Sequence, residues 1–174
     1  MTDQIPLEMD ELRAVAAYAA YCAETVLAIF EAQHPDDARP RQSIAAAHAF
    51  AQGGARGKLL RDTAWAALRA AKQAGSVAAG EAARAAVAAA GAAYLHPLPN
   101  ATQVKHILGA AAHAARATEL DAGDDPAIGA HHLDVLRQAV TPTVVAVLSR
   151  YPVAPAGGGR GGTLLRELDQ ALRG

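Results

Sequence analysis

Aromatic residues and cysteine are both scarce in this 174-residue chain. Aromatic side chains make up 4% of the sequence, and Cys22 is the single cysteine. A lone cysteine excludes an intramolecular disulfide and suits a reducing compartment such as the cytoplasm. With so few large side chains, the core has to be built by close approach of helices, and Cys22 is most simply a small residue within it.

Neither sign of charge is in excess, because the formal net charge is −1. Nothing in this balance points to a nucleic acid or to an anionic membrane as a partner. The N-terminal residues MTDQIPLEMDELR lack the basic region and the apolar run of a signal peptide. No stretch reaches the roughly 18 strongly apolar residues of a membrane span. We therefore expect a cytoplasmic protein with no nucleic-acid partner and no membrane partner.

Alanine is what the chain has in abundance, with 47 residues. Alanine is the best helix former, and the shortage of β-branched and aromatic residues argues against a sheet. The sequence predicts an all-α fold: a single-domain bundle of six to seven mostly antiparallel helices with short loops and an Ala-rich, close-packed core. A length of 174 residues suits one domain. No repeat of 30–45 residues supports a solenoid.

Apolar periodicity and capping residues set the expected boundaries. Residues 1–174 form one domain, with a helical core over 10–155, a Gly-rich linker over 156–162 and a short helix over 163–172. Thr163 is the expected cap of that last helix, and Pro142 predicts a kink, or a restart with Thr141 as cap. Residues 1–7 are expected to be an extended arm and 119–125 a polar loop. The predicted helices cover 9–32, 40–52, 57–74, 77–95, 100–118, 125–150 and 163–172.

The helix predicted over 100–118 carries the first set of candidate binding residues. It is small or apolar nearly all round, so it belongs in the middle of a bundle. Two of its histidines lie seven residues apart and therefore on nearly one face. They could line a cavity, or they could simply be hydrogen-bonded between helices. The candidate ligand or partner residues are His96, Lys105, His106 and His113.

Metal and nucleotide motifs are absent or incomplete. Glu31 and His34 have the spacing used in di-iron bundles, but the motif occurs once and stops at a proline. His131 and His132 are consecutive, so on a helix they point about 100° apart and do not converge on one ion. The GGGRGG stretch over 157–162 contains G-x-G-x-x-G without the strand that a dinucleotide site requires. We expect no metal, no cofactor and no catalytic residue.

The densest charged stretch is HPDDARPR, residues 34–41, between the first two predicted helices. Its four charged side chains are either an internal salt-bridge cluster that pins the two helices or an exposed recognition patch. The tight turn favours the internal cluster, although surface ion pairs are individually weak. The surface-patch candidates are Asp36, Asp37, Arg39 and Arg41.

Four segments together carry a family resemblance. They are DELRAVAAYAAYCAETVLAIFEA (10–32), PDDARPRQSIAAAHAFAQG (35–53), TAWAALRAA (63–71) and AAYLHPLPNATQVKHILGAAAHAARATEL (92–120). They resemble the immunity-five-like family of bacterial immunity proteins from polymorphic toxin systems. The R-P-R junction and the histidine-bearing helix are the more specific parts, and the resemblance covers most of residues 10–120 but not the tail after 120.

The resemblance implies an all-helical protein that neutralises a bacterial toxin by direct protein binding, with the cognate toxin as its partner and no catalysis. The alternative is a small-molecule-binding protein or an enzyme of bacterial specialised metabolism, with its site between helices near His96, His106 and His113. A homodimer that packs Ala-rich faces together is a third interpretation.

Overall fold

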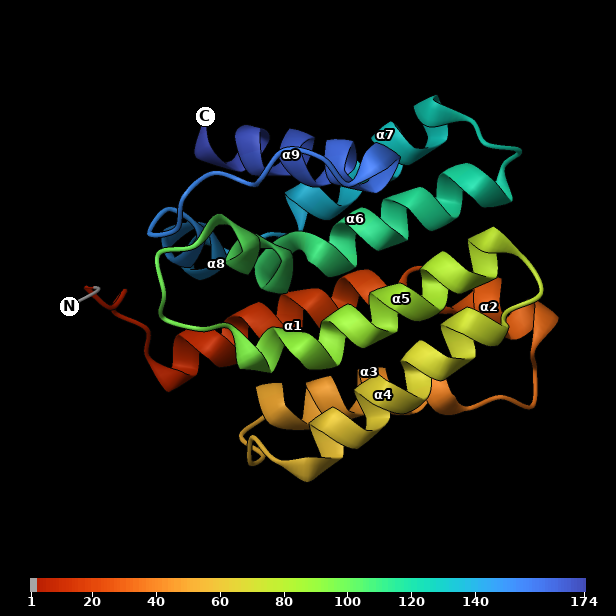
Figure 1. Cartoon of the computed structure of the whole chain (residues 1–174), viewed down its shortest axis with the longest axis horizontal. Coiled ribbons are helices and arrows are strands. Elements are labelled where there is room, and N and C mark those ends of the chain that lie inside the picture. Colours follow the sequence, from red (N-terminus) through yellow and green to blue (C-terminus); the bar gives the residue numbers. More distant parts are fainter. Residues whose placement is uncertain (1–2) are drawn as a thin grey trace.

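The structure, a computed structural model, describes residues 3–174, which form nine α-helices and two short 3-10 helices (Figure 1). Met1 and Thr2, at the start of the predicted arm, lie outside the described residues. The all-α class is confirmed. The helices are α1 (Met9–Glu24), α2 (Leu27–Gln33), α3 (Arg39–Ala51), α4 (Lys58–Gln73), α5 (Val77–Gly91), η1 (Ala92–Tyr94), η2 (Ala101–Gln103), α6 (Val104–Asp121), α7 (Pro126–Gln138), α8 (Pro142–Leu148) and α9 (Gly159–Arg173).

Helices α5 and α6 form the middle of the bundle. They pack most extensively against each other, α5 also packs against α4, and α6 also packs against α7 and α9. Figure 1 shows α3 and α4 along one edge and α7 and α9 along the opposite edge, with α1, α5 and α6 between them. Every buried residue of α5 is alanine or glycine, and so are seven of the eleven buried residues of α6. Small side chains let the backbones approach closely, which is how a chain with few aromatic residues fills its core.

The first predicted helix is broken into two. Helices α1 and α2 meet at a bend of 43°, with Val26 outside helical geometry at φ −122°. The Thr25 hydroxyl donates a hydrogen bond to the Cys22 carbonyl at 2.6 Å, and such a bond competes with the helix ladder and bends it. Both parts still face the core, because Cys22, Val26 and Phe30 are fully buried.

The helix predicted over 125–150 is also two helices, α7 and α8. The Thr141 hydroxyl accepts a hydrogen bond from the Val144 amide, and Pro142 occupies the first helical turn. The restart predicted at Thr141 is therefore confirmed. Asp125 caps α7 and Ser76 caps α5 in the same way, through their side-chain oxygens.

The expected C-terminal boundaries are wrong. Helix α9 begins at Gly159, so residues 159–162 are its first turn and not part of a linker, and Gly158 at φ +79° takes the cap position expected of Thr163. Buried Asp169 accepts a hydrogen bond from the Ala154 amide, and Arg173 donates to the Tyr151 carbonyl, so the preceding loop is also held. A left-handed cap suits glycine, which is why a Gly-rich stretch can start a helix.

Candidate functional site

A surface groove of about 550 Å³ lies between α5, α6 and the start of α9. Its floor is made by small residues of α5 and α6, among them Ala88, Gly109 and Ala112. Residues 155–158 and the first turn of α9 form the opposite wall. Three of the four candidates on or before the central helix line it, namely Lys105, His106 and His113, whereas His96 does not.

His106 is fixed by a hydrogen bond across two helices. Its Nδ1–H donates to the carbonyl of Gly91 at 3.0 Å, so Nδ1 carries the proton of the neutral ring and Nε2 is left as an acceptor. Burial lowers the pKa of His106 below its ordinary value of 6.5, against the opposing effect of that hydrogen bond. The neutral imidazole is therefore the stable form in this groove at neutral pH.

His113 pairs with Glu81 across the α5–α6 interface. Its Nδ1 lies 2.6 Å from Glu81 Oε2, and both residues line the groove. Lys105 is exposed at the rim. His96 uses its backbone instead: its amide donates to Gln103 and its carbonyl accepts from the Tyr151 hydroxyl. The histidines expected to share a site are thus divided between the groove and a loop contact.

The far wall of the groove is anchored by Glu119, which the sequence had placed in a polar loop. Helix α6 continues to Asp121, and the Glu119 side chain is 0% exposed. Arg160 donates from Nε to Glu119 Oε1 at 3.0 Å, and Arg116 donates to Oε2 at 2.9 Å. A buried carboxylate requires such pairing, and the pair with Arg160 joins the end of α6 to the first turn of α9.

Two glycines make room for this arrangement. A Cβ at Gly129 would lie 2.1 Å from Glu119 Cγ, and a Cβ at Gly162 would lie 1.9 Å from the Gly157 carbonyl oxygen. Arg166 donates to that same carbonyl at 2.7 Å. The glycines of the stretch over 157–162 therefore allow a tight, hydrogen-bonded wall.

The groove is a partly apolar surface in which the charged side chains other than exposed Lys105 are already paired with one another or with neighbours. Arg116 also pairs with Asp124 at 2.5 Å, and Arg160 and His113 have carboxylate partners of their own. Within residues 3–174, no three His, Cys, Asp or Glu side chains converge closely enough to hold a metal ion.

The charged turn separates into two ion pairs. Arg39 donates twice to Asp37, and Arg41 pairs with Glu31 of α2, with the Arg41 Nε at 3.0 Å from Glu31 Oε2. Asp36 is exposed and in none of these contacts. Arg41 thus links α3 to α2, but through Glu31, which lies outside the predicted cluster.

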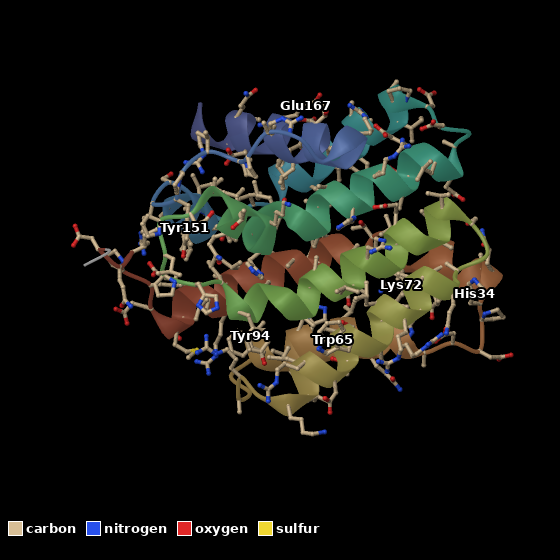
Figure 2. The ribbon with its side chains drawn as sticks, viewed as in Figure 1. His34, Trp65, Lys72, Tyr94, Tyr151 and Glu167 are labelled. Carbon is tan, nitrogen blue, oxygen red and sulfur yellow. The ribbon has the colours of Figure 1, made fainter. Side chains whose placement is uncertain are left out.

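Two large apolar side chains of α4 that the sequence analysis did not single out, Leu59 and Trp65, lie on the surface. Both side chains are 63% exposed, whereas Leu60, Ala67 and Ala70 are buried. Figure 2 shows Trp65 and Lys72 on α4. The sequence did contain a signal for an exposed face, because cationic residues recur every three or four positions on both sides of Trp65.

No single helix within residues 3–174 is long and apolar enough to cross a membrane, although the bent pair α1 and α2 together meets the criteria of length and composition. Comparison with curated proteins and with solved structures gives no match. The model of one family, described as "Imm-5 like putative immunity protein", matches residues 6–139.

That match reaches beyond the resemblance found by inspection, because it includes α7, and it stops before α8 and α9. It spans α1 to α7 and covers well over half of the chain. The chain therefore belongs to the Imm-5 like family.

Proposed function

We propose that this chain is an immunity protein that neutralises a bacterial toxin by binding it directly, without catalysing a reaction. The observation that carries the proposal is the family match over residues 6–139. An immunity protein implies a toxin as partner. It acts by covering or distorting the toxin's active site or the surface with which the toxin binds its target.

The architecture suits that task. Helices α5 and α6 interlock through alanine and glycine, and ion pairs join distant segments, such as Glu11 with Arg150 and Glu119 with Arg160. A scaffold held in one conformation loses little entropy when it binds, so more of the contact energy appears as affinity. We expect such a scaffold to bind its partner as a nearly rigid body.

A small-molecule site in the groove is the weaker alternative. Its volume of about 550 Å³ is adequate, since ligand pockets span roughly 300–1,000 Å³. However, His96 lies outside it, and His113 and Arg160 are occupied by Glu81 and Glu119. The family match also gives this alternative no support.

Co-expression tests the proposed function. Each gene that adjoins the gene of this chain is expressed in a laboratory bacterium, alone and together with the chain. We expect one adjoining product to arrest growth and the chain to restore it, while an unrelated helical bundle at the same expression level does not. Growth arrest that the chain leaves unchanged, or adjoining products that are all harmless, would contradict the proposal.

A further inference from the structure

The outward face of α4 concentrates positive charge around the only tryptophan of the chain. At about 100° per residue, positions 58, 61, 62, 65, 69 and 72 fall within an arc of about 100°. The opposite side of the helix is in the core, through Leu60, Ala67, Ala70 and Ala71. The residues of this outward face, called the α4 face below, are Lys58, Arg61, Asp62, Trp65, Arg69 and Lys72.

The charge of the α4 face departs from that of the whole molecule. Four cationic side chains and one carboxylate give α4 a charge of +3, whereas the whole chain carries −1. Lys58 pairs with Asp62 at 2.5 Å. Arg61, Arg69 and Lys72 are exposed and take part in no salt bridge among the described residues. Their charge is available to a partner.

We propose that the α4 face is the surface that binds the partner protein, with Trp65 entering an apolar pocket that is rimmed by aspartate and glutamate side chains. This inference rests on the proposed function and adds to it the location and the chemistry of the interface. Tryptophan and arginine are the residues most enriched among those that dominate binding energy. Cationic residues around the anchor would steer an acidic partner and raise the association rate.

Three features favour an acidic protein over other occupants. A helix that lies on a membrane needs a broad apolar face, and the apolar side of α4 is already used in the core. A chain of net charge −1 lacks the overall basic character of a nucleic-acid-binding domain. A second copy of the chain would bring two α4 faces of charge +3 together, which like-charge repulsion opposes.

The α4 face also lies inside the family region, whereas one wall of the groove does not. Helix α4 ends at Gln73, well within residues 6–139, and the groove depends on residues 155–165, which follow that region. A binding surface that serves the function of the family is better placed on α4 for this reason.

The test uses the toxin against which the chain protects cells and a chain labelled with 5-fluorotryptophan. Because Trp65 is the only tryptophan, the labelled chain gives one fluorine resonance, whatever tryptophans the unlabelled toxin contains. We expect the toxin to shift and broaden this resonance. Trp65→Ala should raise Kd by about thirtyfold or more, as expected for an anchor residue.

Charge-reversal variants test the cationic part of the α4 face. The double variant Arg61→Glu with Arg69→Glu should lower the association rate by about tenfold or more and make it less sensitive to salt. Arg137→Glu on α7 is the control for reversing an exposed arginine on another face. Arg137 pairs with Asp134, so the rates are compared per reversed charge, and this variant should slow association far less. Circular dichroism and melting confirm that each variant is folded.

The outcomes separate this inference from the proposed function. If the toxin is bound and neutralised while the fluorine resonance and the variants' rates stay unchanged, the α4 face is wrong and the proposed function stands. If the wild-type chain fails to bind any toxin, both fail. Equimolar phosphatidylglycerol–phosphatidylcholine vesicles and duplex DNA serve as the other probes. A response to either, with none to the toxin, would overturn the inference in favour of a membrane or a nucleic acid.

Discussion

Arg160 and Glu119 form an ion pair that joins the first turn of α9 to the last turn of α6, with Arg160 Nε 3.0 Å from Glu119 Oε1. The carboxylate is fully buried, and the hydrogen bonds to it raise the pKa of Arg160 above its ordinary value. The pair fixes one wall of the groove and explains why the stretch over 157–162 is held in place despite its glycines.

Removing the arginine should therefore destabilise the fold. Arg160→Ala leaves the buried carboxylate of Glu119 with Arg116 alone, and a buried acceptor that loses its donor costs about 1–3 kcal/mol. Urea unfolding measures the loss. The control is Arg137→Ala, which removes an exposed ion pair with Asp134 and should cost much less stability. Equal effects of the two variants would show that the buried pair has no special weight.

Gly129 should be intolerant of a methyl group only while Glu119 is present. Gly129→Ala places Cβ in the space of Glu119 Cγ and should cost about 1–3 kcal/mol of stability. In a Glu119→Ala background the same change should gain about 0.5–1 kcal/mol, because alanine is favoured over glycine inside a helix. A double-mutant cycle with additive effects would refute the contact.

The packing of α6 predicts that two of its alanines differ in how well they tolerate replacement by leucine. Ala115 is fully buried, so Ala115→Leu should cost about 1–3 kcal/mol through overpacking. Ala112 lines the groove, so the leucine in Ala112→Leu has space and should cost less than about 1 kcal/mol. Thermal melting of the two variants tests this prediction. If Ala112→Leu lowers the melting temperature more than Ala115→Leu does, the groove has no room for the leucine.

The stability of the protein should fall in mild acid. The folded state lowers the pKa of His106 below 6.5, chiefly through burial, so below that pH the unfolded chain binds more protons and stability declines. His132 acts in the same direction, whereas Glu11, whose pKa is lowered to about 2 by Arg150, stays ionised in both states near neutral pH.

His106→Asn places an amide donor at the position of Nδ1, facing the Gly91 carbonyl, and removes this titration. Its melting temperature should change less than that of the wild type between about pH 7.5 and about pH 5.5. His132→Gln should remove a further part of the dependence. Identical pH profiles for the wild type and His106→Asn would contradict the assignment.

Local signals predicted several helix starts well, because a capping side chain marks them. Thr141 caps α8 as predicted, and Ser76 and Asp125 cap the helices that begin directly after them. The break between α1 and α2 was not predictable, because it depends on the hydrogen bond that the Thr25 hydroxyl donates to the Cys22 carbonyl of its own helix. The start of α9 was missed for another reason, because Arg160 gains its partner only through a contact across 41 residues.

The candidate site was predictable in part. The spacing of seven residues did bring His106 and His113 to one groove. Their hydrogen-bond partners, Gly91 and Glu81, belong to a different helix, α5. Charge patterns in the turn suggested that Arg41 pairs with nearby aspartates, whereas tertiary packing offers it Glu31 instead. Sequence spacing identifies faces, and only packing identifies partners.

The most direct test of the account is a titration of the purified toxin's activity with the purified chain. Binding without catalysis predicts that residual activity falls linearly and reaches zero at a fixed whole-number molar ratio, with a complex of that ratio seen by light scattering. Activity that persists at excess chain would contradict neutralisation by this protein. Activity abolished by a small fraction of an equivalent would contradict direct binding, because only a catalyst acts at that ratio.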